Sequence, residues 1–420
     1  MINKIKIHLT FFIIVISSTV NASITLENAY KASLEKTEPM IIAESQLRGA
    51  EAKVTQSRSN YFPNLSLKED YLNQSTEIGA SAKKEQSDFR ISLTQSLLAG
   101  GKDSANTDLA ESLQTAAEYN LSVTRNNLYS DVAKAFYTLM SASQEVANID
   151  KSIELLQKRS AELQKLNAIG RTRQIDVLAV KAQSSVLKAQ KLSAEADRQI
   201  AKNNFANITG LDRDSKLSDE TPFPKNLNSI NSYLVDLEKR PDIQGLKSIA
   251  ESFEDSRRTA SAGHYPTLDL TGNYYLNHEG APNTAQSKDE WNAGLTLTIP
   301  LFAGSSVSSQ IKQADELKLQ SEFNLKKKLR DDETDIRTAY NTLLGAIEQI
   351  KALENALAAT EQNYKEQEKG YRYKMVTNLD VLQALNTFQD TQRTLDRTHF
   401  LALNAVAQLK AKTYQIIQIK

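Results

Sequence analysis

Cysteine is absent from this chain of 420 residues, which excludes disulfide bonds, thiolate metal sites, cysteine nucleophiles and a lipid-modified N-terminal cysteine. Histidine is scarce, and the four that occur show no metal-ligand spacing: His8, His264, His278 and His399. Neither sign of charge is in excess, because 51 Lys and Arg balance 51 Asp and Glu. A nucleic-acid partner is therefore not expected, since it would need a strongly basic surface.

The chain also has few features of an integral bundle of helices or of an enzyme. The mean hydropathy of −0.46 is too polar for a set of membrane-spanning helices, each of which needs about 20 apolar residues. The segment Gly100-Gly101-Lys102 resembles part of a phosphate-binding loop, but Asp103 stands where Ser or Thr is required. Ser81 and Lys84 are spaced as in a serine hydrolase, but the accompanying Lys-Thr-Gly is missing. We expect no enzymatic activity, no metal and no cofactor.

The densest apolar run lies near the N-terminus. Lys4 and Lys6 precede the apolar segment Phe11–Ile16, and small residues follow as far as Ala22. This pattern predicts a secretory signal peptide at residues 1–22. A membrane anchor is the alternative, and it is disfavoured because the apolar run is short and ends in small polar residues.

The sequence repeats itself at a spacing of about 200 residues, which is too long for a solenoid unit and indicates duplication of one structural half. For example, Ile175-Asp176-Val177-Leu178 matches Leu379-Asp380-Val381-Leu382. We expect a first repeat at 23–210 and a second at 241–420. The linker between them, 211–240, is rich in Pro, Asp, Asn and Ser.

Each repeat contains a helix of unusual length. No glycine or proline interrupts Lys102–Ile169, and Ser305–Lys369 contains only Gly345, so each helix would extend on the order of 100 Å. Shorter helices are predicted at about Gln174–Asn207 and Asn378–Ile417, with narrow apolar stripes. Such lengths favour a coiled coil or a helical tube over an ordinary bundle, whose helices average about three turns.

Between the helices, apolar and polar residues alternate in four segments. Strands are predicted at about 64–73, 88–98, 267–276 and 291–302. Each is about ten residues long, which suits a tilted strand that crosses a bilayer with one apolar face. A half-buried soluble sheet would alternate in the same way. Open strand edges cannot exist in lipid, so four such strands predict a barrel completed by other copies. The lipid-facing side chains would include Trp291, Leu295, Leu297, Leu268 and Leu270.

Taken together, these features resemble the TolC-like outer-membrane factors, or outer membrane efflux protein family. The resemblance covers essentially the whole mature chain. It implies a mainly α-helical protein with a transmembrane β-barrel part, built from duplicated halves. Three chains would form a homotrimer with a long α-helical coiled-coil tunnel and a 12-stranded barrel. The most specific segments are Gln56–Leu65, Leu98–Gly101, Arg240–Ile243, Ile299–Gly304 and Thr377–Leu382.

The resemblance implies an outer-membrane channel, a passive duct from the periplasm to the exterior in a tripartite efflux or type I secretion system of a Gram-negative cell. Its partners would be a periplasmic adaptor (membrane fusion protein), an inner-membrane pump of the RND, ABC or MFS type, and outer-membrane lipid. A periplasm-spanning structural or adhesive coiled-coil outer-membrane protein is the alternative, and the four amphipathic strands argue against it. A barrel-embedded enzyme would lack a catalytic constellation.

The turns between the long helices carry the function that the resemblance implies. By resemblance, Asp176 and Tyr371 would form a latch between neighbouring hairpins, and Asp380 would contribute to an acidic ring at the pore gate. Gathering like charges would raise the pKa of at least one ring carboxylate. The alternative role for each aspartate is a charge at a helix N-terminus. The adaptor would dock on the hairpin tips formed by Gly170, Arg171, Thr172, Arg173, Lys374, Met375, Val376 and Thr377.

Three positions depart from the family pattern. Lys374 stands where the second turn usually has glycine, so the docking geometry of that turn is open. Val376 occupies the position of an arginine that forms a second latch, and Gln383 replaces the acidic residue of a further ring. We therefore expect a resting channel that is leakier and less cation-selective than is typical of the family.

Overall fold

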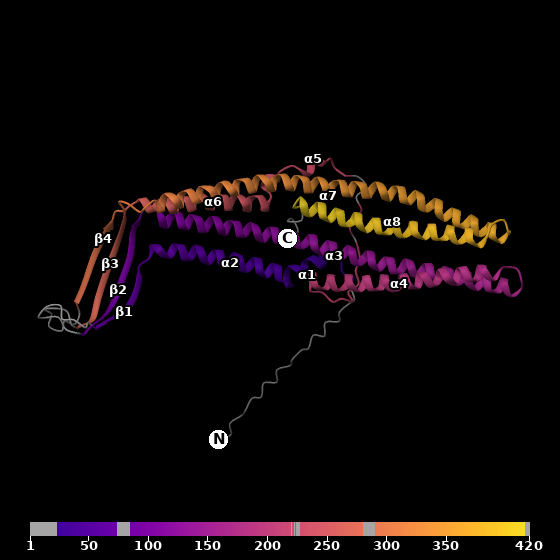
Figure 1. Cartoon of the computed structure of the whole chain (residues 1–420), viewed down its shortest axis with the longest axis horizontal. Coiled ribbons are helices and arrows are strands. Elements are labelled where there is room, and N and C mark those ends of the chain that lie inside the picture. The colour runs from indigo at the N-terminus through magenta and orange to yellow at the C-terminus, as the bar shows by residue number, and fades with distance from the viewer. Residues whose placement is uncertain are drawn as a thin grey trace, which may run out of the picture. The chain divides into compact units, whose positions relative to one another are not determined.

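The computed structural model describes residues 23–73, 85–219, 221, 223, 227–279 and 290–415. The expected signal peptide, 1–22, lies outside these residues. Among the described residues, none of the helices combines the length and apolar character that a membrane-spanning helix requires. Figure 1 shows the elements, which in chain order are α1 (Leu26–Lys36), α2 (Glu38–Arg58), η1 (Ser59–Tyr61), β1 (Asn64–Asn73), β2 (Glu85–Ala99), α3 (Lys102–Ala168), α4 (Gln174–Thr209), α5 (Ile230–Tyr233), η2 (Leu237–Lys239), α6 (Pro241–Ser261), η3 (Ala262–His264), β3 (Thr267–Glu279), β4 (Glu290–Thr298), α7 (Ser306–Arg372) and α8 (Asn378–Lys412).

The four strands form one antiparallel sheet in the order β1-β2-β3-β4, in which β2 of the first repeat pairs with β3 of the second. The predicted end of the last strand is wrong. β4 stops at Thr298 rather than at residue 302, because Pro300 has no N–H to donate to a neighbouring strand. Beyond it, Leu301 and Phe302 are 94% and 89% exposed.

The register separates an apolar face from a polar face, as the alternation predicts. Leu268 and Leu270 lie opposite Leu297 and Leu295, and Trp291 lies opposite Tyr274. These side chains are half-buried or exposed, with Leu295 and Leu297 at 64% and 60%. Much of this apolar face is thus exposed in the described chain, and exposed apolar patches of this kind mark surfaces that contact a partner or a membrane.

The opposite face of the sheet carries a cross-strand series of polar side chains. The Ser92 hydroxyl donates to Asn273 Oδ1 over 2.7 Å, and Asn273 Nδ2 donates to Asn292 Oδ1 over 3.0 Å. Side chains from β2, β3 and β4 therefore satisfy one another across the sheet, which stabilises the register of the strands.

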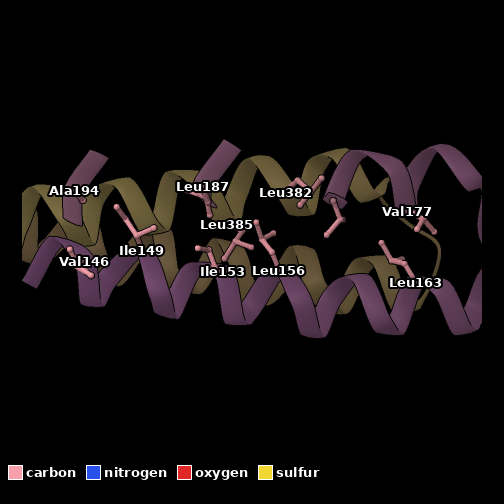
Figure 2. Packing of buried hydrophobic residues seen from close by; sticks show 11 residues of the cluster. Val146, Ile149, Ile153, Leu156, Leu163, Val177, Leu187, Ala194, Leu382 and Leu385 are labelled. Carbon is pink, nitrogen blue, oxygen red and sulfur yellow. The ribbon is translucent and has the colours of Figure 1, made fainter. Parts of the chain in front are cut away.

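The described residues fall into two compact units, each with segments of both repeats. The first contains residues up to Ser33, from Val132 to Phe223 and from Ala356 to Phe400, and the second contains the rest. In the first unit, buried side chains at three- and four-residue spacing on α3 face those of α4 and α8 (Figure 2), as in a coiled coil. The cluster comprises Val146, Ile149, Ile153, Leu156 and Leu163 of α3, Val177, Val180, Leu187 and Ala194 of α4, and Leu382 and Leu385 of α8.

In the second unit, a buried group of charges joins α6, α7 and the segment after α8. Arg240 pairs with Asp242 at 2.7 Å and with Asp332 at 3.1 Å, and Lys328 pairs with both carboxylates. The Tyr414 ring lies 5.0 Å from the Arg240 guanidinium carbon. Burial raises the pKa of Asp332, whereas hydrogen bonds from Arg240 and Lys328 outweigh burial and lower the pKa of Asp242. The two cations balance the two carboxylates. Because Arg240, Asp242 and Asp332 are buried, loss of one charge leaves another buried charge without its partner.

Replacing Arg240 with methionine should therefore destabilise the protein by about 3–5 kcal/mol, because it leaves two buried carboxylates with only Lys328. Arg257→Met, within α6, is the matched control, since Arg257 pairs with Asp315 while 42% exposed. That loss should stay below about 1 kcal/mol. Denaturant unfolding followed by circular dichroism measures both values, and equal losses would contradict a special role for the buried cluster.

Candidate functional site

The turns that close the two helical hairpins have the same backbone geometry. At the α3–α4 turn, Gly170 N–H donates to Asn167 O over 2.9 Å and Arg171 N–H donates to Leu166 O over 2.8 Å. At the α7–α8 turn, Lys374 N–H donates to Tyr371 O and Met375 N–H donates to Gly370 O, over 3.0 and 2.9 Å. This is the left-handed helix ending that usually selects glycine.

Lys374 thus adopts the conformation of a glycine. Its φ is +60°, against +72° for Gly170. The lysine that departs from the family pattern leaves the backbone of the second turn unchanged, although it adds steric strain and a cationic side chain. Val376 packs within the same turn, because its Cγ2 lies 3.2 Å from where a Cβ on Gly370 would be.

Relief of that strain is measurable. Lys374→Gly should raise the free energy of unfolding by about 0.5–1 kcal/mol, because glycine adopts the left-handed conformation without steric strain. Glycine also increases the conformational entropy of the unfolded chain, which offsets part of this gain. Lys374→Ala removes the charge but keeps the strain, and so should give no such gain. If the alanine variant is stabilised as much as the glycine variant in denaturant unfolding, the strain assignment is wrong.

The first turn contains a relay of hydrogen bonds that ends on the second hairpin. The Thr172 hydroxyl donates to Asp176 Oδ2 over 3.2 Å and shares a hydrogen bond of 2.9 Å with the Tyr371 hydroxyl. Because its single proton goes to Asp176, Thr172 accepts from Tyr371. Arg173 also binds the Asp176 carboxylate, at 3.2 Å. Asp176 and Tyr371, expected to pair directly, are therefore joined through Thr172.

A buried arginine holds the same two hairpins together. Arg159 of α3 donates to Asn378 Oδ1 over 3.2 Å, and its guanidinium carbon lies 4.3 Å from the centre of the Tyr371 ring. Asn378 Nδ2 in turn donates to the Asp176 backbone carbonyl over 3.3 Å. Arg159 is 8% exposed and Asn378 is 1% exposed. The closely packed set is thus Arg159, Thr172, Asp176, Tyr371 and Asn378, called here the inter-hairpin network.

Sequence reasoning missed Arg159 and Asn378. One signal could have found the arginine. Arg159 stands between Leu156 and Leu163, at a spacing of three and four residues, on the apolar stripe of α3. A charged residue at a core position of a coiled coil usually fixes pairing or register. No such signal marked Asn378, the first residue of α8.

Asp380 caps the N-terminus of α8. Its carboxylate accepts from the Thr377 backbone N–H at 2.7 Å and from the Thr377 hydroxyl at 2.6 Å. These hydrogen bonds lower the pKa of Asp380. The capping contribution is therefore full above the ordinary aspartate pKa and is lost as the pH falls through the lowered value. A ring of like charges would shift the pKa in the opposite direction. Gln383, about one helical turn further along, is exposed.

A groove of about 440 Å³ lies between the two turns. Its lining includes four residues of the inter-hairpin network, Thr172, Asp176, Tyr371 and Asn378. Arginine and lysine side chains of the two turns also line it. Thr377 and Val376 also face it. Met375 is 79% exposed beside it. The predicted gate residues Asp176 and Tyr371 therefore lie at one site with most of the predicted tip residues. Asp380, Gln383, Gly170 and Met375 do not line the groove.

The chain matches the family described as "Outer membrane efflux protein" over residues 29–211 and 236–413. It belongs to the outer membrane efflux protein family. The family consists of channels, so the prediction of an outer-membrane export channel is confirmed at this level.

Individual relatives agree with this assignment. The chain is 24% identical to outer membrane protein TolC of Vibrio cholerae, over 96% of this chain and 94% of that protein. It is 25% identical to the proteases secretion protein PrtF of Dickeya chrysanthemi, over 64% of this chain and 60% of that protein. The solved outer membrane protein VceC of Vibrio cholerae shares the fold, with a TM-score of 0.79 and 21% identity over 92% of this chain and 95% of VceC.

Proposed function

We propose that three copies of this chain form a passive duct from the periplasm to the cell exterior. The observation that carries the proposal is the four-stranded sheet, which has one uncovered apolar face and has β1 and β4 as its outer strands. Three such sheets would close into a 12-stranded barrel in the outer membrane, with no strand edge exposed to lipid. The long helices would line a tunnel, and residues 211–240 would form a belt around it.

The partners follow from the same assignment. Relatives are described as a toluene efflux pump outer membrane protein and as protease secretion proteins. We extend to this chain a role with a periplasmic adaptor and an inner-membrane pump of the RND, ABC or MFS type. The adaptor would dock on the hairpin tips, at Gly170–Arg173 and Lys374–Thr377. The pump, rather than the duct, would select the exported molecule.

The inter-hairpin network is proposed as the latch that holds the periplasmic end closed. It joins one hairpin to the other through one cation–π contact and several hydrogen bonds, so opening requires several of these contacts to break together. Asp380, with Gln383 one turn later, is proposed to face the lumen in addition to capping α8. The exposure of both residues is consistent with that position.

The barrel assignment predicts a face-specific effect of charge. Leu295→Arg places a charge on the lipid face and should cost about 2–4 kcal/mol per chain near the bilayer midplane. Thr296→Arg is the matched control on the next residue, which faces the polar side of the sheet. The yield of heat-modifiable trimer in outer-membrane fractions should fall for Leu295→Arg and should equal the wild-type yield for Thr296→Arg. Equal yields would contradict the barrel.

The latch and the ring predict different electrical effects in planar bilayers. Thr172→Val breaks the relay and, like Asp176→Ala, should weaken closure by about 1 kcal/mol, which raises the ratio of open to closed channel about fivefold. Thr172→Ser keeps the hydroxyl and should behave as the wild type. Asp380→Asn should instead weaken cation preference and block by multivalent cations. If Asp380→Asn changes neither, Asp380 only caps the helix.

A further inference from the structure

The end of helix α8 matches the end of helix α4 in its backbone but not in its side chain. α4 ends at Thr209, and Gly210 follows with a left-handed φ of +65°. α8 ends at Lys412, and Tyr414, at the matching place of the second repeat, has a φ of +54°. Glycine adopts this conformation without steric cost, whereas a residue with a Cβ does not. Tyrosine is therefore strained at a position that glycine fills in the first repeat.

The backbone of this helix ending does not account for the tyrosine. Tyr414 N–H donates to Ala411 O and Gln415 N–H donates to Lys410 O, both over 3.1 Å. The same pair of hydrogen bonds closes the α3–α4 turn with Gly170 at the left-handed position. Strained residues persist chiefly where the surrounding structure over-determines them. The reason for tyrosine at this position therefore lies in its side chain.

The Tyr414 side chain contacts the buried group of charges around Arg240. The centre of its ring lies 5.0 Å from the Arg240 guanidinium carbon. Arg240 is 8% exposed and pairs with Asp242 of α6 and Asp332 of α7. A cation–π contact gains strength when the cation is shielded from water. The ring therefore fastens the end of α8 to the group of charges that joins α6 and α7.

Two further contacts hold the same end of α8. Asn126 of α3, which is 6% exposed, donates through Nδ2 to Ala411 O over 2.8 Å. Lys412 pairs with Asp335 of α7, and their side chains are 44% and 49% exposed. An ion pair that is so exposed contributes little to stability. The buried contacts of Tyr414 and Asn126 therefore provide most of the anchoring.

Helix α8 connects this anchored end to the inter-hairpin network. It is a single helix of 35 residues, about 50 Å long, and its first residue, Asn378, belongs to the network. Between its ends it contacts α3 through hydrogen bonds. Asn148 Nδ2 donates to Asp396 Oδ2 over 2.7 Å, and Gln408 Nε2 donates to Ser130 O over 3.0 Å. A rigid element that is guided in this way carries a displacement of one end to the other.

We propose that Tyr414 is a positioning residue for the closed channel, because by anchoring the end of α8 it sets the axial position at which Asn378 meets Arg159. The inference rests on the proposed role of the inter-hairpin network as the latch, and it adds a residue remote from that network. Without the ring, α8 is free to shift along its axis, where one residue corresponds to about 1.5 Å. A shift of that size exceeds the tolerance of a hydrogen bond, so the contacts of Asn378 would break.

The test compares glycine and phenylalanine at position 414 of the full-length protein in planar bilayers. Tyr414→Gly relieves the backbone strain but removes the ring, whereas Tyr414→Phe keeps the ring. The glycine variant should raise the ratio of open to closed channel about fivefold, and the phenylalanine variant should match the wild type. Lys412→Gln, the matched control at the same helix end, should change the ratio by less than about twofold. A glycine variant that matches the wild type would overturn the proposal.

A double-mutant cycle with Thr172→Val shows whether Tyr414 acts through the latch. Independent sites more than about 10 Å apart have additive effects. In the Tyr414→Gly background the latch is already displaced, so Thr172→Val should change the ratio by less than about twofold instead of about fivefold. A full fivefold effect in that background would show that the two residues act independently, and the positioning role would be lost.

Hydrogen exchange separates this inference from the proposed latch. Mass spectrometry of the full-length protein in detergent follows the amides of residues 381–388, which exchange when the start of α8 opens. Tyr414→Gly should speed their exchange about fivefold, and Tyr414→Phe should leave it unchanged. If Thr172→Val alone does not alter the open-to-closed ratio, the latch fails, and the exchange result then decides whether Tyr414 positions α8. Unchanged exchange in Tyr414→Gly would overturn the positioning role in either case.

Discussion

The sheet of four strands imposes the constraint on which the rest of the structure depends. One of its faces is apolar and uncovered, and its outer strands, β1 and β4, each present an edge to which no other described strand is paired. In water the apolar face would be costly, and in lipid the unpaired backbone groups would be costly. The proposed closure with other copies would satisfy both requirements. In that assembly the long helices would share the symmetry of the barrel, and gating and docking would be properties of the assembly.

Within the helical part, buried polar groups fix which surfaces meet. Arg159 interrupts the apolar stripe of α3 and contacts Tyr371 and Asn378 of the other hairpin. Arg240 likewise joins α6 to α7 through Asp332 in the second compact unit. At both sites each buried charge must keep its partner, because removing one partner leaves an unpaired polar group inside the protein.

Patterns within a segment predicted most of the fold. The absence of glycine and proline predicted α3 to within one residue of its end, and alternation predicted the bounds of β1. β4 ended earlier than its alternation indicated, since side-chain pattern does not reveal that Pro300 cannot join the ladder. Alternation specifies which face a residue occupies, but not where pairing stops.

The site was less predictable because its contacts join segments about 200 residues apart. The resemblance pointed to Asp176 and Tyr371, yet the hydroxyl between them, on Thr172, follows only from the geometry of both turns. Asn378 sits at an ordinary helix start and carries no signal of its burial. The sequence left the docking geometry of the Lys374 turn open. In the structure, Lys374 takes the glycine conformation and the turn's backbone hydrogen bonds are kept.

The number of copies in the membrane-embedded particle tests the central claim most directly. Native mass spectrometry of the full-length protein, released from lipid nanodiscs, reports that number without any mutation. The account predicts three copies per particle, because that is the number that gives a closed 12-stranded barrel from four strands each. A particle of one or two copies that remains embedded in lipid would contradict it, since the strand edges would then have to be satisfied in another way.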